Sequence, residues 1–390
     1  MNVAVQDDSA RGSQKLQRND FTGSSLRIGI DVHSIGSKKG GNETYYRELV
    51  RGLDTVPSNH KFILYYTNPL APPLSQEGKF TLQRVHPSSR SLRIPLGFPW
   101  RMRKDKLDVF HAQYVVPPFP SCKTVVSIFD LAHERYPQFF HPMEGRALRA
   151  LTRWSAKRAD RIVTVSNFSK QDLIERYGVK PENITVVYLA ASDEFHPMES
   201  ESCREYVDKH YELASPYILY AGRLQARKNL VRLVEAYAQL HQKGIEEKLV
   251  LVGKQDWQAD VIMECVRKHG LESRVTFLGY VPGEDLPYLY NAAKIFIYPS
   301  IFEGFGLPVV ESMACATATI TSYGSSLEEI VGDSALLVDP LSVSSISDAM
   351  EKVLRDGDLR QSLRERGLAR SREFSYRAAT EKTLAIYESV

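Results

Sequence analysis

The chain has 390 residues, of which 43% are hydrophobic and 25% charged, and this composition predicts a soluble globular protein of two or three domains. No apolar stretch approaches the roughly 18 to 20 residues that a membrane-spanning helix needs, and the N-terminus lacks the pattern of a secretion signal. The four cysteines are dispersed, without the spacing of metal ligands or of a disulfide framework, so we expect a reducing cytoplasm and no bound metal.

The net charge of +3 is unevenly distributed along the chain. Residues 1–195 hold 28 Lys and Arg against 19 Asp and Glu, whereas the remaining residues carry a net charge of −6. This asymmetry predicts an anionic partner for the first half, such as a lipid headgroup, a lipid diphosphate or a membrane surface. Nucleic acid is a weaker candidate, because no recognition motif accompanies the charge.

The first half of the chain alternates strand and helix patterns. Residues 1–25 are polar and aperiodic, which predicts a disordered leader. Beyond them, strands are predicted at residues 26–32, 61–66, 109–111, 124–129, 161–165 and 184–188, a glycine loop at 36–41, and helices at about 43–53 and 143–159. Strands that alternate with helices predict a parallel, doubly wound sheet over residues 26–195.

The second half restarts the same pattern after a linker region at residues 193–215. Strands are predicted at residues 217–220, 248–252, 275–278 and 293–298, and helices at residues 230–242, 259–268 and, at the C-terminus, 374–390. The sequence therefore predicts a second sheet of the same α/β class, so that both halves look Rossmann-like.

The turn after the strand at residues 293–298 carries the strongest functional signal. Pro308 suits the first position of a helix, so the amides of residues 305–307 lie at the positive end of a helix dipole, which favours phosphate or sugar oxygens. Glu303 and Glu311 flank these amides, and each carboxylate can bind sugar hydroxyls. The segment is typical of a nucleotide-sugar site, although glycine-rich turns occur in many α/β proteins.

This spacing of Glu303 and Glu311 resembles the Glu-x7-Glu signature of retaining glycosyltransferases of family 4, whose two-domain architecture is called GT-B. Further matches are Tyr220-Ala221-Gly222-Arg223-Leu224, Lys228-Asn229-Leu230, Leu251-Val252-Gly253, Phe277-Leu278-Gly279-Tyr280-Val281 and Ala335-Leu336-Leu337-Val338-Asp339-Pro340. The resemblance implies an acceptor-binding domain at residues 26–195 and a nucleotide-sugar-binding domain at residues 196–373. It also implies that the terminal helix at residues 374–390 crosses back onto the first domain.

The resemblance also implies roles for individual residues. Without a metal, the growing charge of a departing diphosphate must be neutralised by cations and helix amides. Arg223 and Lys228 are expected to hold the diphosphate, Glu303 the transferred hexose and Glu311 the ribose. The other implied donor-binding residues are Gly41 in the glycine loop, Gly253 near the nucleobase, and Phe305, Gly306 and Leu307 through their amides.

The segment Phe129-Asp130-Leu131 departs from the family pattern, because many relatives carry His-Asp-Leu there. Phe129 cannot donate a hydrogen bond, and we interpret it as a subfamily trait. His133 could take over a polar role or be structural, and Asp130 could orient a hydroxyl or cap a turn. No Asp is placed well enough to be named the base, which fits same-face substitution, in which the leaving phosphate oxygen accepts the proton of the acceptor.

A basic segment with interleaved apolar residues extends from Lys79 to Lys106. Its members are Arg84, Arg90, Arg93, Arg101, Arg103 and Lys104 together with Leu92, Ile94, Leu96, Phe98 and Trp100. One interpretation is a surface that meets anionic lipid and presents a lipid-linked acceptor, because cationic and aromatic side chains suit headgroup regions. The other is a solvated loop with a partly buried Trp.

The resemblance implies a retaining hexosyltransferase that uses a nucleotide sugar and a glycan or lipid-linked acceptor, without a metal or cofactor. Resemblance to a mannosyltransferase-like branch of bacterial polysaccharide biosynthesis makes GDP-mannose the first choice of donor, with a UDP-hexose left open. A cytoplasmic protein in peripheral contact with the membrane is expected. An NAD-dependent oxidoreductase is disfavoured because the loop with Gly36, Gly40 and Gly41 lacks the Gly-x-Gly-x-x-Gly pattern. A catalytically silent sugar-nucleotide-binding protein stays open.

Overall fold

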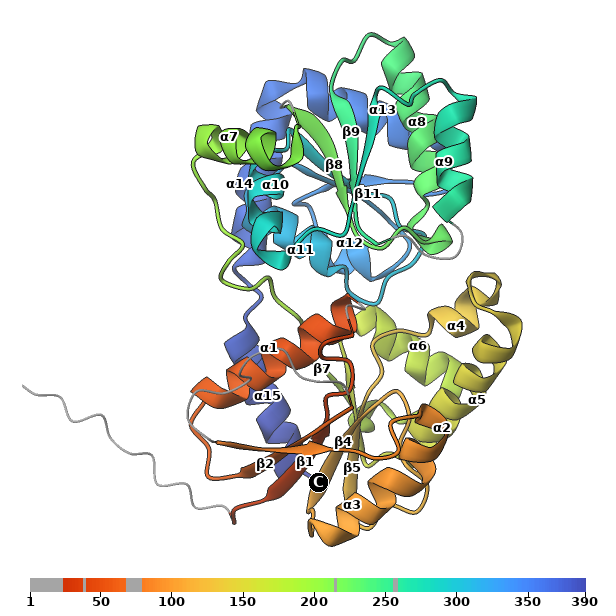
Figure 1. The fold of residues 1–390 in the computed structure, drawn as a ribbon, viewed down its shortest axis with the longest axis vertical. Coiled ribbons are helices and arrows are strands. Elements are labelled where there is room, and N and C mark those ends of the chain that lie inside the picture. Colours follow the sequence, from red (N-terminus) through yellow and green to blue (C-terminus); the bar gives the residue numbers. More distant parts are fainter. Residues whose placement is uncertain (1–23, 38–39, 68–78, 214–215, 255–258) are drawn as a thin grey trace, which may run out of the picture.

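The computed structural model describes residues 24–37, 40–67, 79–213, 216–254 and 259–390 (Figure 1). The predicted disordered leader falls, except for its last two residues, outside these ranges. Two lobes lie one above the other, and each is a sheet with helices on both faces (Figure 1).

Seven parallel strands form the sheet of the N-terminal lobe, in the order β3-β2-β1-β4-β5-β6-β7. They are β1 (Arg27–Asp31), β2 (Lys61–Tyr66), β3 (Phe80–Arg84), β4 (Val109–Gln113), β5 (Lys123–Ser127), β6 (Arg161–Thr164) and β7 (Ile184–Val186). Strand β3 was not predicted. It lies at the edge of the sheet with only Phe80 buried, so it lacks the apolar run that marks a central strand.

Six parallel strands form the sheet of the C-terminal lobe, in the order β10-β9-β8-β11-β12-β13. They are β8 (Tyr217–Ala221), β9 (Lys248–Val252), β10 (Val275–Gly279), β11 (Ile295–Tyr298), β12 (Thr319–Ser322) and β13 (Leu336–Val338). All residues of β8 and β11 are buried, as expected of central strands covered on both faces. The predicted class, two doubly wound parallel sheets, is confirmed.

Helices connect the strands and cover both sheets. Those of the N-terminal lobe are α1 (Gly41–Thr55), α2 (Arg90–Leu92), the π-helical turn η1 (Arg93–Gly97), α3 (Phe98–Lys104), α4 (Ala132–Arg135), α5 (Pro142–Arg158) and α6 (Asn167–Tyr177). Those that follow are α7 (Ser200–Tyr211), α8 (Leu230–Gln242), α9 (Ala259–Lys268), α10 (Leu286–Ala292), α11 (Leu307–Ala314), α12 (Ser326–Val331), α13 (Val343–Arg355), α14 (Gly357–Ser371) and α15 (Tyr376–Glu388). Local signals set the ends of several. Helix α6, for example, begins after the side-chain cap Ser166 and ends at Gly178, whose φ is 66°.

The last helix, α15, lies in the N-terminal lobe beside α1 (Figure 1). Gly52 of α1 makes this approach possible, because an added Cβ would overlap the Thr380 hydroxyl of α15. Polar contacts reinforce the packing. His111 of β4 lies 2.7 Å from the Tyr387 hydroxyl through Nδ1 and 2.7 Å from the Ser127 hydroxyl through Nε2, and burial lowers its pKa to about 3. A neutral imidazole therefore ties α15 to the centre of the first sheet.

The substitution Gly52→Ala tests this contact. Alanine normally stabilises a helix relative to glycine by about 1 kcal/mol, but here overpacking against Thr380 should cost about 1–3 kcal/mol. Gly357→Ala is the matched control, because at this helix start the nearest atom to an added Cβ is Arg360 Nη2 at 3.8 Å. Scanning calorimetry should show a lower melting temperature for Gly52→Ala alone. Equal melting temperatures for the two variants would contradict the close packing of α15 on α1.

Candidate active site

The carboxyl ends of the strands of both sheets face the boundary between the lobes, where open parallel sheets bind their ligands (Figure 1). From the C-terminal lobe, three segments meet at this edge: the turn after β8, the turn after β9 and the loop between β11 and α11. From the N-terminal lobe, the start of α1 and the loop after β5 reach the same boundary. The predicted site residues lie on these segments, with His133 and Glu311 a short distance beyond.

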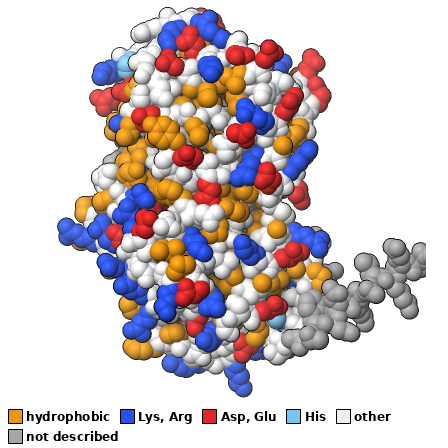
Figure 2. Space-filling model, turned by 180° about the vertical axis from the view of Figure 1, so that it is seen from behind, with side chains coloured by type: hydrophobic (Ala, Val, Ile, Leu, Met, Phe, Trp, Pro, Cys, Tyr) orange, Lys and Arg blue, Asp and Glu red, His pale blue; other side chains and the backbone are white. Residues whose placement is uncertain are grey.

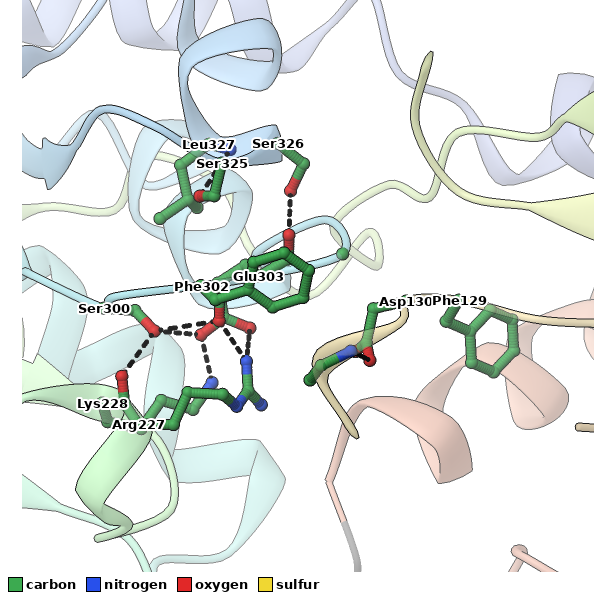
Figure 3. A network of polar contacts seen from close by, with 12 residues as sticks. Phe129, Asp130, Arg227, Lys228, Ser300, Phe302, Glu303, Ser325, Ser326 and Leu327 are labelled. Atoms are coloured by element: carbon green, nitrogen blue, oxygen red, sulfur yellow. Dashed lines mark hydrogen bonds and ion pairs between the residues drawn. The ribbon is translucent and has the colours of Figure 1, made fainter. Parts of the chain in front are cut away.

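A buried carboxylate, Glu303, is the centre of the polar network in Figure 3. Its side chain is 9% exposed. Oε1 accepts hydrogen bonds from the Lys228 ammonium and, at 2.6 Å, from the Ser300 hydroxyl, while Arg227 Nη1 lies 3.1 Å from Oε2. Burial alone would raise the pKa of Glu303, but Arg227 and Lys228 outweigh it and lower the pKa to about 2. The carboxylate is therefore ionised throughout the neutral range.

Lys228 and Arg227 reach this carboxylate because they share one short turn before α8. The side-chain amide of Asn229, a residue with φ of 65°, donates to the carbonyls of Pro299 at 3.1 Å and Pro340 at 2.5 Å. These bonds hold the turn against the loop that carries Glu303. The Lys228 ammonium also donates to the Tyr298 hydroxyl at 2.6 Å. Burial lowers the pKa of Lys228 to about 8, although Glu303 opposes this shift.

Arg227 is a site residue that was not predicted from the sequence. The signal was present as the adjacent basic pair Arg227-Lys228, but only Lys228 matched the family motif. In the structure both cations contact one carboxylate, and Arg227 also donates to the Phe302 carbonyl and interacts electrostatically with Asp130.

Arg223 lies on the turn that leaves β8 and is a half-buried residue. Its carbonyl accepts a hydrogen bond from the Tyr220 hydroxyl at 3.0 Å. The neighbouring turns approach unusually closely, because an added Cβ on Gly253 would overlap the Gly222 carbonyl. Both glycines have positive φ, 153° at Gly222 and 142° at Gly253, so no other residue fits there without strain. Beside Arg223, the site therefore exposes the backbone of Gly222 and Gly253 without a side chain.

The loop between β11 and α11 places Phe305, Gly306 and Leu307 at the start of that helix. Gly306 is the N-cap with φ of 97°, and an added Cβ would overlap Leu327. The side chains of Phe305 and Leu307 are 4% and 7% exposed, so they anchor the turn in the core. The first amides of a helix have no intrahelical acceptor, so this turn offers its donors to the site.

Glu311, the second carboxylate of the pair, has a different environment. It is half-buried within α11 and accepts a hydrogen bond from the Tyr290 hydroxyl at 3.0 Å. Burial raises the pKa of Glu311 to about 7, and the hydrogen bond from Tyr290 opposes this shift only in part. The two carboxylates therefore differ in charge state near neutral pH, which the sequence could not reveal.

The N-terminal lobe meets the loop between β11 and α11 at Gly304, and this loop, residues 299–306, is called the donor loop below after the donor-binding residues predicted on it. An added Cβ there would overlap the carbonyl of Phe129 and approach Asp130 Cβ to 2.9 Å. The Ser166 hydroxyl donates to the Gly304 carbonyl at 2.7 Å. Asp130 Oδ1 accepts from the Ala132 amide at 2.9 Å, and its side chain lies across from Arg227 (Figure 3). The structure thus brings Asp130 to the site.

Phe129 and His133 both lie within the N-terminal lobe. The ring of Phe129 points away from Glu303 and packs on Tyr45 and Tyr114, with ring centroids 4.7 and 5.8 Å away (Figure 3). His133 is 1% exposed, lies 3.2 Å from the Tyr177 hydroxyl through Nε2, and has its pKa lowered by burial. This packing gives no support to the polar role considered for His133 beside the sugar. Gly41, in contrast, is exposed at the start of α1, with open space around it.

The raised pKa of Glu311 predicts a pH dependence of stability. The folded state holds a proton on Glu311 up to pH of about 7, whereas the unfolded chain releases it near 4.5, so this contribution is lost as pH rises between these values. The slope can reach about 1.4 kcal/mol per pH unit. Glu311→Gln keeps a partner for Tyr290 and removes the titration.

Urea unfolding of both proteins from pH 5 to 8 measures the effect. Wild type should lose stability relative to Glu311→Gln as pH rises to 7, and the difference should then level off. A difference in free energy of unfolding that is constant across this range would show that Glu311 titrates normally.

Known proteins resemble this chain in sequence and in fold. Residues 39–194 match the family model Glycosyltransferase Family 4, and residues 207–370 match Glycosyl transferases group 1. The chain is 34% identical over 291 residues to O-antigen chain mannosyltransferase B of Escherichia coli, covering 74% of this chain and 76% of that protein. It is also 34% identical over 228 residues to the serotype-specific mannosyltransferase WbdA of Escherichia coli, covering 56% of this chain but only 28% of WbdA.

The solved structure of sucrose-phosphate synthase from Thermosynechococcus elongatus has the same fold, with a TM-score of 0.79 at 22% identity over 93% of this chain and 98% of that chain. The two Rossmann-like lobes are those of the GT-B architecture. With both family models and a relative aligned over three quarters of its length, the chain belongs to glycosyltransferase family 4.

Proposed function

We propose that this glycosyltransferase moves a hexose from a nucleoside diphosphate sugar to a glycan or lipid-linked oligosaccharide, with retention of configuration. The observation that carries the proposal is the ionised, buried Glu303 with its two cations, set beside the helix amides of residues 305–307. Such a site combines a fixed acceptor for sugar hydroxyls with positive charge for a departing diphosphate.

In this proposal each group has one task. Lys228 and Arg223, with the α11 amides, neutralise the diphosphate as the glycosidic bond breaks. Glu303 binds the hexose and Glu311 binds the ribose. The nucleobase binds against the turn that contains Gly253, and the phosphate lies close to the start of α1 at Gly41. Asp130 orients the acceptor hydroxyl, and the leaving phosphate oxygen takes its proton. Because protein groups supply the positive charge, we propose that the reaction is independent of metal ions.

Mannose is the proposed hexose and GDP-mannose the proposed donor, in bacterial surface-polysaccharide assembly. The support is that two relatives, each 34% identical to this chain over the matched residues, are mannosyltransferases. A UDP-hexose is the alternative donor, because backbone contacts at Gly253 and Gly279 would not by themselves select a base.

Transfer assays with GDP-mannose and with UDP-glucose test the site directly. Lys228→Ala and Arg223→Ala should each lower turnover by about two to three orders of magnitude, as the loss of a charge-stabilising donor does. Lys243→Ala is the control, because this half-exposed lysine pairs with Asp348 and Glu351 away from the site. Near-normal transfer by both site variants at saturating donor would rule out the diphosphate assignment. Binding of a donor by wild type without any transfer would indicate a silent sugar-nucleotide-binding protein.

The basic segment forms a helical surface that suits a peripheral membrane contact. Segments α2, η1 and α3 run on from one another, and Leu92, Leu96 and Trp100 recur along them every four residues at 46%, 62% and 53% exposure. Arg101 and Lys104 lie 4.8 and 4.7 Å from the Trp100 ring centroid. Figure 2 shows abundant Lys and Arg side chains on the lower, N-terminal lobe. No helix in the described ranges has the length and apolar character to cross a bilayer.

Two members of the segment do not belong to this surface. Phe98, expected to assist membrane contact, is 1% exposed and packs on Phe110 at a centroid distance of 4.9 Å. Arg93 is 4% exposed and donates to the Ser88 carbonyl at 2.9 Å. The position of each residue around the helix explains the burial of Phe98 and Arg93. These two side chains face the sheet, whereas Leu96 and Trp100 face outward.

Co-sedimentation with vesicles tests the membrane proposal. Changing Arg90, Arg103 and Lys104 to Ser should weaken binding to anionic vesicles, at roughly 1 kcal/mol per cation, and high salt should act in the same direction. Leu96→Ser with Trp100→Ser should also weaken it, whereas Leu341→Ser, a comparably exposed apolar residue of the other lobe, should not. Equal binding of wild type to anionic and neutral vesicles would contradict the proposal.

A further inference from the structure

Glu329 belongs to the C-terminal lobe, but its carboxylate is bound by the N-terminal lobe. Oε1 accepts hydrogen bonds from the Asn167 amide at 2.8 Å, the Asn167 side chain at 2.9 Å and the Tyr188 hydroxyl at 2.7 Å. Oε2 accepts from the Phe168 amide at 2.9 Å. One side chain of α12 therefore receives four hydrogen bonds from the other lobe.

These donors include the first amides of α6. Asn167 and Phe168 open this helix, where amides lack intrahelical acceptors and the helix dipole favours a negative charge. The cap of α6 from its own lobe, Ser166, accepts only from the Ser169 amide, at 3.1 Å. Glu329 thus completes the cap from across the boundary, and hydrogen bonds to a charged acceptor are stronger than those to a neutral one.

The first turn of α12 supports the donor loop. The Ser326 hydroxyl donates to the Glu303 carbonyl at 2.8 Å (Figure 3), and Leu327 fills the space that a side chain at Gly306 would need. Arg370 of α14 holds α12 itself, donating to the Glu329 carbonyl at 3.0 Å and the Ile330 carbonyl at 2.9 Å. Glu329 is therefore mounted on the same helix that braces the Glu303 loop.

The start of α6 also contacts the donor loop directly. The Ser166 hydroxyl donates to the Gly304 carbonyl, and the Ser169 hydroxyl donates to the Phe129 carbonyl at 2.9 Å. Asn167 and Phe168, which bind Glu329, therefore lie between Ser166 and Ser169 in the chain. These two serines contact Gly304 and Phe129. Figure 1 shows α6 and α12 meeting at the boundary of the lobes.

We propose that Glu329 is a positioning residue that fixes the N-terminal lobe against the donor loop. By capping α6 from α12, it holds Asp130 on the acceptor side at a set distance from Glu303 on the donor side. Rates of group transfer depend steeply on such placement. In this proposal Glu329 does not contact the substrate. The predictions about turnover rest on the proposed transfer reaction, whereas those about the arrangement of the lobes do not.

The neighbouring residue provides a matched control. Glu329→Gln keeps the size of the side chain but turns an NH2 group toward donors that need an acceptor. Glu328→Gln makes the same charge change on the same helix, where Glu328 is exposed and its carboxylate lies 3.5 Å from the Gly324 amide of its own lobe. Tyr188→Phe removes a single donor to Glu329 and allows a double-mutant cycle.

Three measurements on the full chain are expected to agree. Glu329→Gln should lower kcat at least tenfold while the dissociation constant of GDP, measured by calorimetry, changes less than twofold. Tyr188→Phe should lower kcat less in the Glu329→Gln background than in wild type. Small-angle X-ray scattering without ligand should show a larger radius of gyration for Glu329→Gln than for wild type, and no change for Glu328→Gln.

Equal scattering and equal kcat for the two glutamine variants would overturn the proposal, as would a GDP affinity that falls in step with kcat. Should Glu329→Gln fail to fold, the same comparisons between Tyr188→Phe and Glu328→Gln decide the matter. If wild type transferred no sugar from any donor, the proposed function would fail, but the scattering comparison would still test the role of Glu329.

Discussion

The pairing of the buried Glu303 carboxylate with Arg227 and Lys228 is the interaction on which the rest of the site depends. Removing one partner from a buried ion pair typically costs about 3–5 kcal/mol, so these three side chains hold each other in place. Glu303 lies on the loop after β11, and both cations lie on the turn before α8. Their contact therefore fixes two neighbouring crossovers of the second sheet, and with them the amides at the start of α11 and the turn that bears Arg223.

The same two cations also act on Asp130 of the N-terminal lobe, which raises the pKa of each of them. Two cations contact the Glu303 carboxylate, and burial lowers the pKa of Lys228 to about 8. We infer that a diphosphate in the proposed reaction takes over the ammonium of Lys228, while Arg227 stays on Glu303. The carboxylate would then be free on one oxygen to accept a hexose hydroxyl. The Glu303–Lys228 ion pair would then hold the loop after β11 and the turn before α8 in place until the donor binds.

Helices and strands that are defined by their own local sequence could be predicted. The bounds of β2, β9, α8 and α9 match the predictions to the residue, because apolar periodicity and breakers define them. Features set by distant partners could not be predicted. Lys228 meets Glu303 and Glu329 meets Asn167 across separations of 75 and 162 residues, and no local pattern encodes either contact. The burial of Phe98 and Arg93 likewise depends on which face of a helix meets the sheet.

The exchange of Lys228 between carboxylate and diphosphate is most directly tested by a crystal structure of the protein with its sugar nucleotide bound. In that complex we expect the Lys228 ammonium to lie within hydrogen-bond distance of a diphosphate oxygen. Arg227 should still form its ion pair with Glu303, and the other oxygen of Glu303 should accept a hydrogen bond from a hexose hydroxyl. A complex in which Lys228 stays on Glu303 and the diphosphate binds elsewhere would contradict it.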